Sequence, residues 1–277
     1  MRLEPSFQKA SSEGKLVLLP EIIVGFPSME RSVRALDYLA DLNHLIYKTA
    51  TPVASGWPMN TNDAIRRAHA SALSNGVDLT RTVETIARYR PNVLTIYSDA
   101  ITDPFRAFLD RLEGYVDGII LAEGNEPEDR AILKTGLSYS KCRELCRDRG
   151  IDFVPAVSTW NRPEVIREKV LSAKGFVYLM ISTGTGGTIF GGARIQGMLD
   201  RISELRKVPV AVAFGVRGPQ EIRMVHGLRG CGGAVIGTRI IETLSQSLTS
   251  YTELIDSIAT YASSDRADIS RSARSNA

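Results

Sequence analysis

Short apolar runs alternate along the whole chain with longer segments in which apolar residues recur every three or four positions. Continuous apolar runs are typical of strands in a parallel sheet that is buried on both faces. The pattern predicts strands over residues 16–24, 45–50, 92–97, 118–121, 152–156, 176–181, 209–214 and 233–237.

The segments between these runs have a helical period. Val33, Leu36 and Leu39 share one helix face, and Met198, Ile202 and Leu205 repeat the pattern later in the chain. Further helices are predicted over residues 62–75, 79–88, 103–112, 138–149, 163–172, 219–224 and 247–261. Eight strand–helix units in a chain of this length predict an α/β fold, a single (β/α)8 TIM barrel. A doubly wound open sheet is the alternative.

Domain boundaries follow from the absence of a Pro/Gly-rich linker in the sequence. We therefore expect one barrel domain over residues 1–262. Residues 263–277 are rich in Ser, Arg and Asp without an apolar period, and they are predicted to form a disordered tail.

Composition narrows the class of protein. The chain has 277 residues, 43% of them hydrophobic, and 34 Lys and Arg balance 31 Asp and Glu. This balance excludes a disordered chain and argues against a nucleic-acid partner. The 3 cysteines form neither a disulfide framework nor a zinc motif, and no run approaches the roughly 20 apolar residues of a membrane helix. We expect a cytoplasmic protein that contacts no membrane and carries no cofactor or metal.

Glycine-rich turns follow the last three predicted strands, at residues 181–188, 213–219 and 234–239. In barrels of this type the active site lies on the loops after the strands, and phosphate is often held after strands seven and eight. Backbone N–H groups at glycines and at a helix N-terminus bind such an anion. We expect a phosphorylated small-molecule substrate bound by Gly187, Gly215, Gly237 and Thr238. The alternative is that these glycines serve only tight strand-to-helix turns.

Several motifs resemble one family, the tryptophan synthase alpha subunits. They are E-I-I-V-G-F-P-S at 21–28, S-A-L-S-N-G-V at 71–77, G-F-V-Y-L-M-I-S-T-G at 175–184, V-P-V-A-V-A-F-G-V at 208–216 and G-A-V-I-G-T at 233–238. The motifs keep the family's order over about residues 3–260. The resemblance implies a TIM barrel that cleaves indole-3-glycerol phosphate to indole and glyceraldehyde 3-phosphate and passes indole to a pyridoxal-phosphate-dependent β subunit.

The second strand departs from the family pattern. The family has E-L-G-V-P with an essential Glu there, followed by D-P-x-A-D-G-P with a catalytic Asp, whereas residues 45–58 read L-I-Y-K-T-A-T-P-V-A-S-G-W-P. Matching Pro52 to the first proline places Lys48 at the Glu, and matching A-S-G to A-D-G places Ser55 at the Asp. A second placement puts His44 at the Glu. We favour Lys48 because residues 45–47 then continue the strand, and both placements lose both carboxylates.

A lysine at a barrel mouth is able to form a Schiff base with a carbonyl substrate when its amine is partly neutral. The leading hypothesis is therefore a lyase that makes or breaks a carbon–carbon bond in a phosphorylated substrate through Lys48. Glu21, which replaces a typical aromatic residue, is a candidate acid or base, and the other candidates for proton transfer or for lining the substrate are Asp99, Glu123, Tyr97 and Tyr178. Alternatively, Lys48 forms a buried structural ion pair with Glu21 or Glu123.

Two further functions remain open. One is true tryptophan synthase alpha activity with acid and base residues relocated to other strands. The other is a non-catalytic alpha-like regulatory subunit of a pyridoxal-phosphate-dependent β-type partner. A homo-oligomer is a further possible assembly. His69 and His226 are predicted to lie on helices as solvated or capping residues.

Overall fold

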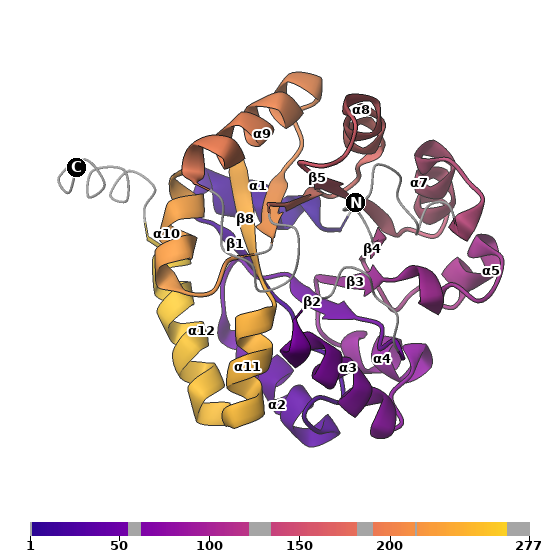
Figure 1. The fold of residues 1–277 in the computed structure, drawn as a ribbon, viewed down its shortest axis with the longest axis vertical. Coiled ribbons are helices and arrows are strands. Elements are labelled where there is room, and N and C mark those ends of the chain that lie inside the picture. Colours follow the sequence, from indigo (N-terminus) through magenta and orange to yellow (C-terminus); the bar gives the residue numbers. More distant parts are fainter. Residues whose placement is uncertain (1, 55–61, 122–133, 182–190, 214, 265–277) are drawn as a thin grey trace.

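Eight parallel strands form the centre of the molecule (Figure 1). A computed structural model describes residues 2–54, 62–121, 134–181, 191–213 and 215–264 of the chain. The strands are β1 (Val17–Pro20), β2 (Tyr47–Ala50), β3 (Asn92–Ile96), β4 (Gly118–Leu121), β5 (Asp152–Ser158), β6 (Val177–Met180), β7 (Val210–Ala213) and β8 (Cys231–Ile236).

The strand order is β1-β8-β7-β6-β5-β4-β3-β2, so the first and second strands stand at the two ends of the sheet. Two isolated parallel bridges, Leu18–Leu45 and Glu21–Lys48, join these ends. The Leu18 and Ile22 amides donate to the carbonyls of His44 and Lys48, at 2.9 and 3.0 Å. The sheet therefore closes, and the predicted (β/α)8 barrel is confirmed.

Helices surround the barrel (Figure 1). They are α1 (Glu4–Ser12), α2 (Met29–Tyr38), α3 (Asp63–Ser74), α4 (Leu79–Ile86), α5 (Phe105–Asp110), α7 (Tyr139–Arg147), α8 (Pro163–Ser172), α9 (Gly192–Leu205), α10 (Pro219–Gly227), α11 (Thr238–Gln246) and α12 (Leu248–Ala262). Polar side chains cap several of them, among them Ser28 before α2 and Asp78 before α4, which accept the amides of Arg31 and Arg81. These caps satisfy N–H groups that the first helical turn leaves unpaired.

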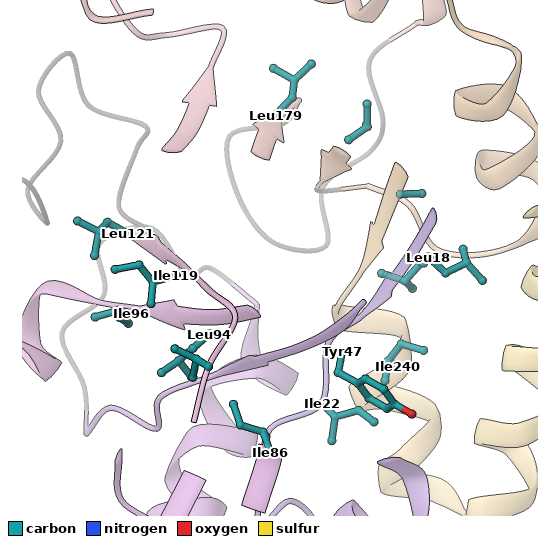
Figure 2. Packing of buried hydrophobic residues seen from close by; sticks show 14 of the residues in the cluster. Leu18, Ile22, Tyr47, Ile86, Leu94, Ile96, Ile119, Leu121, Leu179 and Ile240 are labelled. Carbon is teal, nitrogen blue, oxygen red and sulfur yellow. The ribbon is translucent and has the colours of Figure 1, made fainter. Parts of the chain in front are cut away.

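Each strand separates two layers of apolar side chains. Outward-facing residues such as Leu18, Leu94 and Leu179 belong to the cluster beneath the helices (Figure 2). Inward-facing residues such as Val17, Val93 and Phe176 form a second cluster inside the barrel. Burial on both faces explains why the strands read as continuous apolar runs.

The N-terminal helix α1 was not predicted from the sequence. Its Phe7 and Ala10, with the preceding Leu3, join the cluster inside the barrel and therefore close one end of it. The carboxylate of Asp152 anchors this segment by accepting the amides of Arg2 and Leu3, at 2.9 and 3.0 Å. The spacing of Leu3, Phe7 and Ala10 is a helical signal, but it spans only two turns.

Strand β1 is shorter than the sequence pattern predicted, and the turn after it is longer, because the strand ends at Pro20 and not at residue 24. Gly25 in this turn has φ +87°, its amide donates to Ser32 Oγ at 3.0 Å, and its carbonyl accepts from Asn75 Nδ2 at 2.9 Å. A Cβ on Gly25 would lie 2.5 Å from Val77 Cγ2. The turn is thus held between α2 and the end of α3. No helix among the described residues is long and apolar enough to cross a membrane.

Gly25→Ala is expected to lower the free energy of unfolding by more than Gly76→Ala does. Both glycines have positive φ, which costs a residue with a Cβ about 1–2 kcal/mol. At Gly76 a Cβ would meet nothing within 4 Å, whereas at Gly25 the contact with Val77 adds roughly 1–3 kcal/mol of overpacking. Urea unfolding of the two variants measures the difference, and equal losses would contradict the packing argument.

Candidate active site

Lys48 and Glu21 stand side by side where the barrel closes. Lys48 is the second residue of β2, and Glu21 follows the last residue of β1. The backbone bridge between them brings the two side chains to the same height, and both are inward-facing by alternation with Ile46 and Leu19. Folding therefore places an ammonium and a carboxylate together at the carboxyl ends of two strands.

The two side chains form a buried ion pair. Lys48 Nζ donates to Glu21 Oε1, and the lysine side chain is 1% exposed against 14% for the glutamate. Burial lowers the pKa of Lys48, and the negative charge of Glu21 opposes that shift. Because removing a charge from water is costly, burial favours the neutral amine, whereas the direct hydrogen bond to Glu21 favours the ammonium.

Tyr178 lies on the opposite side of the barrel interior from β2. It belongs to β6, and the centre of its ring is 5.6 Å from Lys48 Nζ. Burial, together with the charge of Glu21, raises the pKa of the Tyr178 phenol well above its usual value. The phenol is therefore protonated at neutral pH, as a proton donor must be. The structure brings three predicted residues, Lys48, Glu21 and Tyr178, to one place.

His69 joins this group, although it was predicted to be a solvated or capping residue. That prediction is wrong: His69 is 3% exposed on α3, and its ring meets the Tyr97 ring edge-on at 5.8 Å. The Val53 amide lies 3.3 Å from His69 Nδ1, which is thereby an acceptor. Burial lowers its pKa to about 4, with Glu21 raising it and Lys48 lowering it further. The imidazole is neutral at pH 7 with its proton on Nε2.

A signal for His69 was present in the sequence. The buried residues of α3 are Ile65, Ala68, His69 and Ala72, so the histidine lies within the apolar stripe of the helix. His226 is likewise fully buried and not solvated. His226 belongs to helix α10. Its ring nitrogens Nδ1 and Nε2 lie 3.3 Å from the Tyr261 carbonyl oxygen and 3.1 Å from the Gly14 carbonyl oxygen.

The predicted phosphate-binding turns lie at the ends of β7 and β8. Gly215 and Gly237 each follow the register pair Val212–Ala234 by three residues, and Thr238 is the first residue of α11. Gly215 has φ +86°. A Cβ on Gly237 would lie 2.7 Å from Glu21 Oε2, so a larger residue there would force the Glu21 carboxylate to shift. Glu21 therefore stands between Lys48 and the N-terminus of α11.

The remaining predicted residues are not brought to this group by the described structure. Asp99 lies exposed in the short helix η2 (Ser98–Ala100). His44 precedes β2, and its Nε2 lies 2.9 Å from Glu13 Oε2 at the other end of the strand. Ser55, Glu123 and Gly187 are outside the described residues.

Removing Lys48 is expected to destabilise the fold through Glu21. Lys48→Met leaves the carboxylate buried without its cation, at a cost of about 3 kcal/mol. The double variant Glu21→Gln with Lys48→Met removes both charges and should recover much of that loss. Urea unfolding at pH 7 measures the difference, and equal stabilities of the single and double variants would show that the pair carries no such coupling.

The stability contributed by neutral His69 is expected to disappear in mild acid. Its pKa in the folded chain is about 4, below the roughly 6.5 of an unfolded histidine. The unfolded chain takes up the proton first, so this contribution is complete above pH 6.5 and is lost, by about 3 kcal/mol, as the pH falls to 4.

His69→Gln lacks this titration and is the matched control. The gap in unfolding free energy between wild type and His69→Gln should narrow from pH 7 to pH 4, and parallel profiles would refute the assignment. An NMR titration that placed the pKa of His69 near 6.5 would do the same.

Comparison with known proteins gives independent evidence on the family of this chain. The sequence model of the tryptophan synthase alpha chain family matches residues 7–269. Among curated relatives, the tryptophan synthase alpha chain of Acidovorax sp. (strain JS42) is 26% identical over 253 residues, which cover 88% of this chain and 90% of that protein. That of Prochlorococcus marinus (strain MIT 9313) is 27% identical over 251 residues, covering 86% of this chain and 85% of the relative.

Solved structures agree in fold. A chain of Mycobacterium tuberculosis tryptophan synthase superposes with a TM-score of 0.81 at 20% identity, covering 95% of this chain and 98% of the other. A chain of the Pyrococcus furiosus tryptophan synthase complex gives 0.71 at 20% identity, covering 90% and 98%. With the family's sequence pattern extending through all eight strands of the barrel, this chain belongs to the tryptophan synthase alpha chain family.

Proposed function

We propose that the protein is a carbon–carbon lyase for a phosphorylated small-molecule substrate and that Lys48 forms a Schiff base with the substrate carbonyl. The observation that carries the proposal is the buried hydrogen bond between Lys48 Nζ and Glu21 Oε1 at the carboxyl ends of β1 and β2. Membership in a family of lyases supports the reaction class. The phosphate is proposed to bind at Gly215, Gly237 and Thr238, and at Gly187, which lies outside the described residues.

Glu21 is the proton carrier in this proposal. It takes a proton from the Lys48 ammonium, and the free amine then attacks the carbonyl carbon, forming a C–N bond. Glu21 returns the proton to the carbinolamine oxygen, which leaves as water, and an iminium results. Burial lowers the pKa of Lys48, which favours the first proton transfer.

Bond cleavage follows from the iminium. Glu21, again a carboxylate, removes the proton from a hydroxyl on the β-carbon, which is the carbon of the breaking bond farther from the iminium. The C–O bond becomes a carbonyl, the C–C bond breaks, and its electron pair moves into the iminium to form an enamine. Protonation of the enamine and hydrolysis release the second product. Tyr178, protonated and close to Lys48, is the proposed donor for that protonation, and it regains its proton from Glu21, which becomes a carboxylate again.

Charge balance supports the phosphate site as well. An unpaired Glu21 beside Gly237 would repel a phosphate bound at the N-terminus of α11. Lys48 cancels that charge, so the helix N-terminus keeps its attraction for anions.

For assembly, the partner class that we propose is a β-type subunit, because the neighbour from Pyrococcus furiosus was solved as a tryptophan synthase complex.

Borohydride reduction tests the Schiff base. Wild type incubated with phosphorylated aldehydes and ketones, such as dihydroxyacetone phosphate and glyceraldehyde 3-phosphate, is expected to gain a stable adduct on the peptide that contains Lys48. Lys48→Arg keeps a cation beside Glu21 but forms no Schiff base, so it should gain none. Intact and peptide mass spectrometry provide the measurement.

An internal control lies in the same digest. Lys169 is also fully buried, and its Nζ donates to the Ala156 carbonyl at 2.6 Å from α8. An adduct on Lys169 as readily as on Lys48 would contradict a specific role for Lys48. Release of indole from indole-3-glycerol phosphate, retained in Lys48→Arg and lost in Glu21→Gln, would replace the proposal with the reaction named for the family.

A further inference from the structure

The inward-facing side chains on β1, β2 and β3 change from apolar to polar toward the mouth of the barrel. Val17 and Leu19 on β1 are followed by Glu21, Ile46 on β2 by Lys48, and Val93 on β3 by Thr95. The alternation of strand side chains places each of these polar residues above an apolar one on the same face. Three neighbouring strands thus present polar groups at the level where the substrate is proposed to bind.

Thr95 is unusual among these groups because nothing in the described structure accounts for its hydroxyl. The residue is 3% exposed, and Thr95 Oγ1 has no hydrogen-bond partner among the described residues. Its backbone carbonyl is used, accepting from the Thr51 amide at 3.0 Å. A buried unpaired hydroxyl costs about 1–3 kcal/mol, so packing alone would favour valine at this position.

The polar positions form a continuous arc around the mouth. Strand order makes β7, β8, β1, β2 and β3 consecutive around the closed barrel. The arc begins with the Gly237 turn after β8. It continues with Glu21 after β1, whose carboxylate lies beside Gly237, then with Lys48 on β2, and it ends with Thr95 on β3. A linear molecule with its phosphate at β8 and its carbonyl at Lys48 would have its far end at Thr95.

We propose that the organic part of the substrate is a short hydroxylated carbonyl chain, as in a sugar phosphate, and that Thr95 hydrogen-bonds one of its hydroxyls. This rests on the proposed function. A hydroxylated chain offers a donor or acceptor to each buried polar group along the arc. An aromatic ring in the same place would cover the Lys48–Glu21 pair and the Thr95 hydroxyl without hydrogen bonds, and buried polar groups left unpaired discriminate strongly against such ligands.

Matched probes test this binding preference. The dissociation constants of a four- or five-carbon sugar phosphate, an alkyl phosphate of equal length and indole-3-glycerol phosphate are measured by calorimetry on wild type, Thr95→Val and Thr95→Ser. Wild type should bind the sugar phosphate at least tenfold more tightly than the other two. Thr95→Val should lose roughly tenfold on the sugar phosphate and nothing on the alkyl phosphate, and Thr95→Ser should retain the preference.

The two proposals fail separately. Tighter binding of indole-3-glycerol phosphate, or equal effects of Thr95→Val on sugar and alkyl phosphates, overturns the substrate class even if borohydride traps an adduct on Lys48. Conversely, a sugar-phosphate preference that depends on Thr95, with no trapped adduct on Lys48, supports the substrate class and removes the Schiff base. Urea unfolding of Thr95→Val, expected to match or exceed wild type, excludes misfolding as the cause of weaker binding.

Discussion

The contact between β1 and β2 is the constraint on which the site depends, because it is where the barrel closes. Among the described residues, each other pair of neighbouring strands is joined by a ladder of at least three register pairs, whereas β1 and β2 meet through two isolated bridges. One of those bridges carries Lys48 and Glu21, whose side chains then pair inside the barrel. Closure of the sheet and assembly of the charged pair are therefore the same event, and neither residue has a partner of this kind before the barrel forms.

A buried pair of this kind is poor evidence for stability in itself, since apolar residues of similar volume often serve a core better. The position of the Lys48–Glu21 pair affects the electrostatics of the site. Glu21 stands between Lys48 and Gly237, so the charge of one carboxylate is felt both by the amine and by the N-terminus of α11. Pairing with Lys48 neutralises that carboxylate, and the carboxylate in turn opposes the lowering of the Lys48 pKa that burial causes. His69 lies within the electrostatic influence of this pair and is a neutral imidazole, because the effect of burial on its pKa outweighs the opposite effect of the Glu21 charge.

Family membership establishes the fold of this chain, and the chemistry depends on residues at the mouth of the barrel. The sequence model and the solved structures show the family and the fold, while the polar residues on β1, β2 and β3 belong to the interior near the mouth. Barrels of this type divide in that way because strand interiors carry stability and the carboxyl ends carry chemistry. A change of a few inward-facing residues alters what the site can hold without disturbing the apolar layers beneath it.

Much of the fold was determined by the sequence alone, for a local reason. A strand buried on both faces must be apolar throughout, so the eight runs identified the eight strands, with errors at ends such as Pro20, where a turn and not hydropathy ends the strand. Helix α1 was not predicted, because its place in the fold depends on how Leu3, Phe7 and Ala10 pack against residues that are distant in the sequence. The sequence also singled out Lys48, Glu21 and Tyr178, and it offered Glu21 and Glu123 as alternative ion-pair partners of Lys48 without deciding between them. The meeting of those three residues, the burial that makes His69 neutral and the unpaired hydroxyl of Thr95 were decided by the tertiary structure, because desolvation and pairing depend on neighbours that are distant in the chain.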